Sequence, residues 1–283
     1  MKKNKIQEII DHIQQLEPIP SVTHHLLEVL DDDKSSAEEI AAIIQYEPTV
    51  TTNVIRSCNS VYFGRYEPVS SIKDAVATLG IDRIVDIVLY QFGKQAFADE
   101  EGYGEHEGAL WKLSVSSAVM TKHIAIRIGS PNKNQLFTTA LIKDIGKTVL
   151  GRFVKGSIEK INGLVDDKNY TFAQAEKEVI GIDHAEIGGM ITKSWNFPLR
   201  MAKIIEHHHA PDISVIGDKE MAAVYLADRM CIMMGLAGRV DRNDHKFYNA
   251  AMESLGLSQE DLPALIADFN DEMQEVEDLL RVV

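Results

Sequence analysis

Apolar residues recur every three to four positions through most of the chain, which is the spacing of helices that each bury one face. Ser36 and Glu39 have the spacing of a capping box at a helix start. Ser71 begins another such segment, Gly80 ends it, and a further one runs to about Phe97. Since almost every periodic segment has helical spacing, we expect an all-α protein whose N-terminal block holds four or five helices.

The middle of the chain predicts a second helical block. Residues 110–129 and 135–153 each have the pattern of one continuous helix, and residues 129–132 form the turn signal between them. Further helices are expected to begin at Thr171 (with Gln174), at Asp183 (with Glu186) and at Pro198.

Residues 98–108 are acidic and contain glycine, which predicts a surface loop between the two blocks. The segment from Ser258 is amphipathic, and we expect it to pack on its own domain; a dimer or partner helix is the alternative. The predicted organisation is a multi-helix bundle with an N-terminal helical block at 1–98, a second helical block at 99–240 and a C-terminal helical extension at 241–283.

The charge of the chain argues against one class of partner. Its 283 residues include 29 Lys and Arg against 43 Asp and Glu, a formal net charge of −14. Because such a chain repels phosphate backbones and shows no local basic patch, we expect no nucleic-acid partner. The two cysteines lack disulfide or metal spacing, and no apolar run is as long as a membrane span, so we expect a cytoplasmic protein without membrane association.

Four ionisable residues fall on apolar helix faces, where an unpaired charge is costly. Asp228 stands four residues from apolar neighbours on both sides, and Asp144 lies beside the apolar stripe of its helix. His208 is spaced to point inwards, and His184 follows the expected cap Asp183, where a helix N-terminus favours a neutral imidazole. Each residue alone is most often a locally hydrogen-bonded core residue, but the four together predict a convergent site.

The order of these residues resembles the HD superfamily of metal-dependent phosphohydrolases, whose helical core carries a His, a His-Asp pair and a late Asp. The motifs LIKDIGKTVL, IDHAEIGGMITKSWNFP, IIEHHHAP and VYLADRM carry this likeness. Upstream, LEPIPSVTHHLLEVLDD, IAAIIQYEPTVTTNVIRSCNSVYFG and PVSSIKDAVATLGIDRIVDIVL resemble the HDOD family, the HD-related output domain of bacterial signalling proteins. The resemblance runs from about Leu16 to about Met234 and implies an HD-like bundle.

Two positions depart from the pattern of an HD hydrolase. By this resemblance, the first metal-ligating His corresponds to Leu113, and the His of the His-Asp pair corresponds to Lys143. Neither leucine nor a protonated lysine donates a lone pair, so the departures imply a degenerate metal site without hydrolase activity. We hypothesise that the Lys143 ammonium replaces the missing cation beside Asp144 and Asp228; its extension into solvent is the alternative.

The resemblance and its departures together favour a non-enzymatic signal-transduction module without cofactor, which binds a signalling protein or a small ligand; a homodimer is also considered. The alternative is a residual phosphohydrolase for a nucleotide or cyclic dinucleotide, with one divalent ion on Asp144, His184, His208 and Asp228. Against this hydrolase, only Lys143, Lys147 and Arg152 are nearby cations for a phosphate. A nucleotide receptor without turnover is a third interpretation. The predicted site residues are Lys143, Asp144, Lys147, His184, His207, His208 and Asp228.

Overall fold

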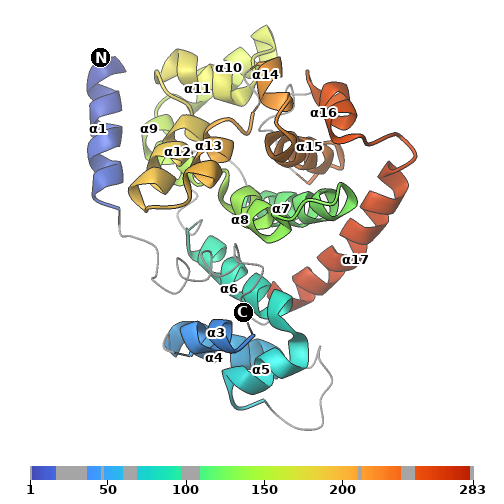
Figure 1. Ribbon diagram of the computed structural model, residues 1–283. Coiled ribbons are helices and arrows are strands. Elements are labelled where there is room, and N and C mark those ends of the chain that lie inside the picture. The colour runs from blue at the N-terminus through green and yellow to red at the C-terminus, as the bar shows by residue number, and fades with distance from the viewer. Residues whose placement is uncertain are drawn as a thin grey trace. The chain divides into compact units, whose positions relative to one another are not determined.

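Every regular element in the described part of the chain is an α-helix, which confirms the all-α prediction (Figure 1). The computed structural model describes residues 2–16, 37–45, 48–59, 69–96, 109–209, 212–236 and 246–280. Among these residues, no helix combines the length and the apolar character needed to cross a membrane. The predicted capping box at Ser36 and the predicted loop at 98–108 lie outside the described residues.

The chain divides into two compact units. The first comprises Met1–Pro18 and Ala96–Ala267, and the second comprises Ile19–Gln95 and Asp268–Val283. The N-terminal helix therefore belongs to the same unit as the middle of the chain. The described helices of the second unit are α3 (Ala37–Ile44), α4 (Pro48–Cys58), α5 (Ile72–Leu79), α6 (Ile81–Ala96) and most of α17 (Leu262–Leu280).

The first unit is built around helices that are buried on nearly all sides. In α15 every residue from Met221 to Ile232 is buried, and α7 packs against both α8 and α15. Such helices carry little solvent-facing surface, so a charged residue in them needs a partner inside the protein. The described helices of this unit are α1 (Lys2–Gln14), α7 (Ala109–Arg127), α8 (Lys133–Ile142), α9 (Gly146–Val154), α10 (Ile158–Lys168), α11 (Phe172–Val179), α12 (His184–Ser194), α13 (Leu199–Glu206), α14 (Ile213–Ile216), α15 (Lys219–Met233), α16 (Tyr248–Leu255) and the start of α17.

A hydrophobic cluster joins α1 to helices α9 to α12. Ile9 and Ile13 of α1 pack with Leu150 of α9, Phe172 of α11 and Ile187 of α12. The helix starts in this region have the predicted local chemistry. The hydroxyl of Thr171 and the carboxylate of Asp183 each accept the backbone N–H three residues on, in complete capping boxes with Gln174 and Glu186.

The predicted single helix over 135–153 is wrong, because the chain breaks into α8 and α9 with a turn at residues 143–145. The packing of α9 on α12 explains the break. A Cβ atom at Gly146 would lie 1.9 Å from the His184 carbonyl oxygen and 2.7 Å from the Gly188 backbone nitrogen. Only a glycine allows this approach of two backbones, and the turn before it moves α9 off the axis of α8.

In the second unit, helix α17 contacts α6. Arg83 of α6 lies 3.9 Å from the Glu272 carboxylate. Apolar residues predicted for one face of α17 are buried within the chain, including Phe269, Met273 and Val276. The helix begins at Leu262, a turn after the predicted start at Ser258.

Candidate functional site

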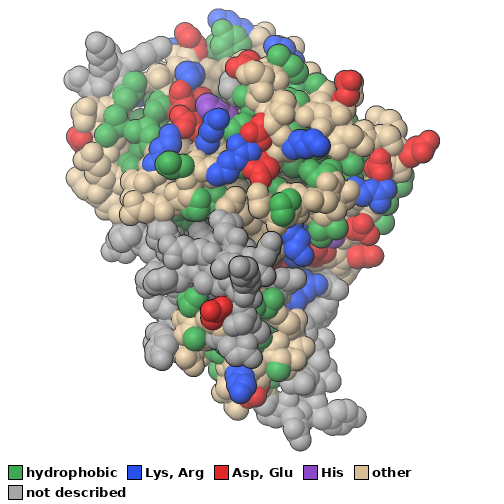
Figure 2. All heavy atoms as spheres, viewed as in Figure 1, with side chains coloured by type: hydrophobic (Ala, Val, Ile, Leu, Met, Phe, Trp, Pro, Cys, Tyr) green, Lys and Arg blue, Asp and Glu red, His purple; other side chains and the backbone are tan. Residues whose placement is uncertain are grey.

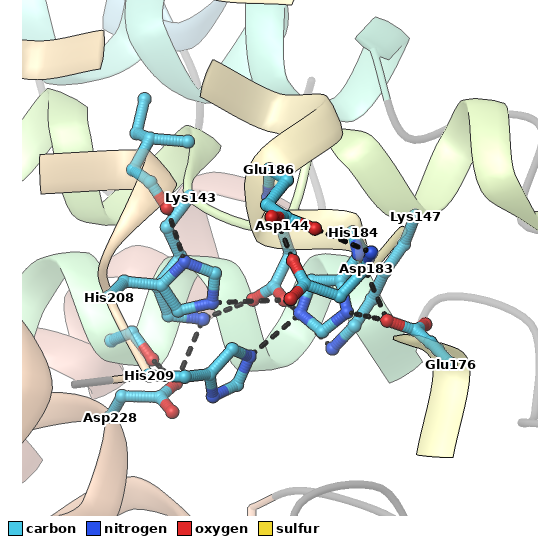
Figure 3. Close-up of polar contacts among 12 residues, drawn as sticks. Lys143, Asp144, Lys147, Glu176, Asp183, His184, Glu186, His208, His209 and Asp228 are labelled. Atoms are coloured by element: carbon cyan, nitrogen blue, oxygen red, sulfur yellow. Dashed lines mark hydrogen bonds and ion pairs between the residues drawn. The ribbon is translucent and has the colours of Figure 1, made fainter. Parts of the chain in front are cut away.

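Six of the predicted site residues meet inside the first unit (Figure 3). The turn between α8 and α9 supplies Lys143 and Asp144, and α9 supplies Lys147. Two of the remaining residues lie at the start of α12 and just beyond α13, and the sixth lies in α15. These are His184, His208 and Asp228, and all six residues are at most 1% exposed.

Lys143 bridges the two aspartates. Its ammonium contacts the Asp144 carboxylate directly, and its Nζ lies 2.8 Å from Asp228 Oδ1. The side chain is 1% exposed, so it does not extend into solvent. One ammonium therefore links the turn after α8 to the centre of α15.

Each carboxylate has a second cation. Lys147 Nζ lies 2.8 Å from Asp144 Oδ1, and the Arg229 guanidinium contacts Asp228 Oδ2. The Ser117 hydroxyl donates to Asp228 Oδ1 at 3.0 Å. Among the described residues of this unit, the buried lysines and arginine balance the buried carboxylates of Asp144, Glu176 and Asp228 one for one. The buried basic and acidic side chains of the cluster are therefore equal in number.

Burial and charge act in opposite directions on these groups. Burial favours the neutral acids, but the neighbouring cations outweigh it and hold the pKa of Asp144 well below its ordinary value and the pKa of Asp228 below its ordinary value. Burial also disfavours the Lys143 ammonium, yet Asp144 and Asp228 raise its pKa above the ordinary value. The two acids and the lysine are thus all charged near neutral pH.

The imidazoles are held by specific acceptors. Glu176 Oε2 accepts both the His184 backbone N–H at 2.9 Å and the ring Nδ1–H at 2.6 Å. His208 Nδ1 donates to the Ile205 carbonyl oxygen at 2.7 Å. Burial, followed by the neighbouring His209, lowers the pKa of His208 well below its ordinary value, so this ring is neutral.

A cavity of about 420 Å³ lies beside this cluster. His207 and His209 line it, and the Nε2 atom of His209 reaches 2.8 Å from His184 Nε2. His207 therefore faces the cavity, outside the cluster, and Arg152 is exposed on α9. Other side chains around the cavity include Gln174, Lys177, Glu186, Glu206, Lys246 and Phe247.

The described surface around this region mixes charges of both signs. On the face that Figure 2 shows, Lys and Arg side chains alternate with Asp and Glu, and histidine is visible between them. Lys177 of the cavity wall, for example, lies 2.7 Å from Glu186.

The resemblance to HD hydrolases implies a divalent metal on the two aspartates, and these residues do not fit one. The place between Asp144 and Asp228 is taken by the Lys143 ammonium, which has no lone pair to offer. Leu113 of α7 is buried and apolar at the other position where the resemblance implies a histidine. The carboxylate pair is therefore balanced by side chains of the protein itself, Lys143 together with Lys147 and Arg229.

Glu176, Ser117, Arg229 and His209 also belong to the site, although the sequence did not single them out. Glu176 lies among the buried residues of α11 and is 0% exposed. Its place three residues after the apolar Ala173 was a detectable signal, of the same kind as that of Asp228. His209 had no such signal, because α13 ends at Glu206 and helical spacing does not apply beyond it.

Comparison with known proteins agrees with this fold. The HDOD domain family model matches residues 16–211. An HDOD domain protein of unknown function from Geobacter sulfurreducens superposes with a TM-score of 0.74 at 24% identity, over 99% of this chain and 96% of that one. A Shewanella amazonensis SB2B protein with the provisional name of phosphohydrolase gives 0.67 at 21% identity, over 93% of each chain. At these identities the likeness shows the fold alone.

A curated relative, an uncharacterized protein of Treponema pallidum (strain Nichols), is 21% identical over 206 residues, which are 71% of this chain. The matched region is 39% of that relative's length, so the chain corresponds to about two fifths of it. The family match covers more than half of the chain and includes most of the first helical block, the turn with Lys143, and His184 to His209. The chain belongs to the HDOD domain family.

Proposed function

We propose that this chain is a non-enzymatic regulatory module of bacterial signal transduction, which binds a signalling protein or a small ligand and has lost the metal site of HD hydrolases. The observation that carries the proposal is the Lys143 ammonium between Asp144 and Asp228. A hydrolase of the HD kind needs a metal at these carboxylates to activate water. A fixed ammonium supplies charge there without an open coordination position.

The charge balance of the site supports the same conclusion. A divalent ion placed on Asp144 and Asp228 would add two positive charges to a buried cluster whose carboxylates already have cationic partners. Such excess charge is costly in a buried site. The two aspartates could therefore bind a metal ion only in a protein in which Lys143 has been replaced.

The cavity beside His209 supports a small ligand as one input to the module. Its volume of about 420 Å³ lies in the range of pockets for small molecules. Its wall combines paired charges with the aromatic ring of Phe247, over which the Lys246 ammonium lies at 4.8 Å. This favours a ligand with both polar and planar parts. A nucleotide that binds without turnover is the second candidate that this observation supports.

The test is a hydrolysis assay on protein purified without an affinity tag of histidines. The wild type and an Asp144→Asn variant are incubated with manganese, iron or zinc and offered bis(p-nitrophenyl) phosphate, p-nitrophenyl phosphate and cyclic dinucleotides. We expect no turnover above that of the variant. Metal-dependent turnover that Asp144→Asn abolishes would overturn the proposal and restore the residual phosphohydrolase.

A positive control comes from restoring the two missing histidines. The variant Leu113→His with Lys143→His should take up metal, since it frees the carboxylates and adds two imidazole ligands.

A thermal-shift assay with nucleotides tests whether the cavity binds a small ligand, because a ligand that binds only the folded protein raises the Tm. A shift for the wild type that His207→Ala at the cavity wall reduces would support binding there.

A further inference from the structure

Helix α1 covers an apolar face of the first unit, and few of its side chains hold it there. Among its described side chains, only Ile9 and Ile13 are buried; Ile6 and the following Leu16 are partly buried against the same hydrophobic cluster. Helix α1 contacts α9 and α12, and Figure 1 shows it beside them at the edge of the first unit. We call this surface of α9 and α12 the α1-binding face.

In the described part of the chain, apolar packing alone joins the side chains of α1 to other helices. No hydrogen bond or ion pair of these side chains reaches another described helix, and Gln7 donates to Asp11 within α1 itself. The helix has 13 residues, a length at which an isolated helix is only marginally stable in water. Its helical form therefore depends on the contacts of a few isoleucines.

The backbone connection between α1 and this face is long. Met1–Pro18 belongs to the first unit, but the chain passes through the second unit, Ile19–Gln95, before it returns to the first at Ala96. No short loop therefore ties α1 to α9 or α12, and the helix can leave its face without a change in the backbone of those helices. The HDOD match at residues 16–211 includes this face but not α1.

We propose that the α1-binding face is the docking surface for an amphipathic helix of a partner protein, and that α1 competes with this helix from within the chain. The partner helix carries aliphatic residues at the spacing of Ile6, Ile9 and Ile13, because this is the pattern that the face already accepts. The inference rests on the proposed function, since it assigns a surface and a helix pattern to the signalling protein that the module binds.

The helices that form this face also hold residues of the buried cluster. Helix α9 carries Lys147, and α12 begins with His184. A partner helix in place of α1 therefore packs on the same two helices. The module has two states in this scheme, one with the face covered by α1 and one with the face occupied by the partner.

A fluorescent peptide with the sequence of residues 2–16 is the probe, and its anisotropy is measured with the full chain. The variant Ile9→Asp with Ile13→Asp places two charges in the apolar cluster, which releases α1 and leaves the face free. We expect this variant to bind the peptide and the wild type to bind it at least about tenfold more weakly. A tethered helix at an effective concentration on the order of 1 mM competes to this extent with a peptide whose Kd is about 0.1 mM.

Gln14→Asp with Gln15→Asp is the matched control, since it adds the same two charges at exposed positions of the same segment. This protein should bind the peptide as weakly as the wild type does. A peptide that carries the Ile9→Asp and Ile13→Asp substitutions should bind neither protein. Tryptophan fluorescence during urea unfolding checks that the variant with released α1 is folded.

Hydrogen exchange of the wild type tests the release of α1 without any substitution. The amide protons of α1 should exchange faster than those of α12, and excess peptide should increase their exchange rate further. Protection of α1 equal to that of α12 would overturn the proposal, and so would a folded Ile9→Asp, Ile13→Asp variant that does not bind the peptide. Both results would leave the regulatory function standing.

Two further outcomes separate this proposal from its alternatives. A wild type that light scattering shows to be a dimer, and that the peptide converts into a monomer, would overturn the partner helix in favour of α1 exchange between two copies of the chain. If the peptide binds as expected and the protein also hydrolyses phosphodiesters, the docking face stands and the non-enzymatic function fails.

Discussion

Replacing Lys143 by methionine removes the bridging charge while it nearly preserves the volume of the side chain. Lys143 is 1% exposed and touches both Asp144 and Asp228. Breaking a buried ion pair by removing one partner costs about 3–5 kcal/mol. In the variant each carboxylate keeps one cation, Lys147 or Arg229. We therefore expect the free energy of unfolding to fall by about 3 kcal/mol, the lower end of this range. That loss lowers the Tm by roughly 6–12 °C for a unit of this size.

Tryptophan fluorescence during urea unfolding measures this loss in the relevant unit. The two tryptophans of the chain, Trp111 and Trp195, both lie in the first unit, so the signal does not include the second unit. Lys193→Met is the matched control. The Lys193 ammonium also pairs with a carboxylate, that of Glu206 at 2.6 Å, but the lysine side chain is 46% exposed. We expect the control to change the free energy of unfolding by at most about 1 kcal/mol. A Lys143→Met loss no larger than that of the control would refute the bridging role.

The remaining predictions concern pH and backbone packing. The pKa values of Asp144 and Asp228 are lowered in the folded protein, so the stability that these carboxylates contribute is present above the unfolded pKa of about 4 and is lost as the pH falls from there through the folded pKa values. Urea unfolding at a series of acid pH values should show this loss of stability. In Lys143→Met the loss should begin at a higher pH, because the carboxylates lose a cation that lowers their pKa. Gly146→Ala should destabilise the first unit by about 1–3 kcal/mol or more, because its Cβ meets the backbone of α12. Gly163→Ala in α10 meets only an ordinary contact at 3.9 Å and should stabilise by about 0.5–1 kcal/mol; urea unfolding compares the two.

Local chemistry made several parts of the fold predictable. The cap residues Ser71, Thr171 and Asp183 mark the starts of α5, α11 and α12, because a side-chain oxygen next to a helix start satisfies a free backbone N–H wherever the helix later packs. The break between α8 and α9 was not predictable in this way. It depends on the contact of Gly146 with a helix that begins almost 40 residues later, and the apolar spacing continues across it.

Only part of the site could be predicted from the sequence. Helical spacing marks Asp228 as facing inwards, and the structure buries it. His208 is also buried, but it lies in a turn beyond α13, where helical spacing no longer decides direction. The direction of a long side chain such as Lys143 depends on the distant Asp228 brought near it by folding. The sequence predicted His207 as a site residue, but His209 is the histidine that contacts His184. This contact also depends on residues that only folding brings together.

The charged state and place of the Lys143 ammonium are the centre of this account, and nitrogen-15 NMR of lysine side chains measures both. The Lys143 signal is assigned by its absence in Lys143→Met. We predict an ammonium whose protons exchange slowly with water and which stays charged above the ordinary lysine pKa of about 10.4, because its pKa is raised by Asp144 and Asp228. A Lys143 signal that exchanges as fast as those of exposed lysines, or a neutral amine at neutral pH, would contradict the account.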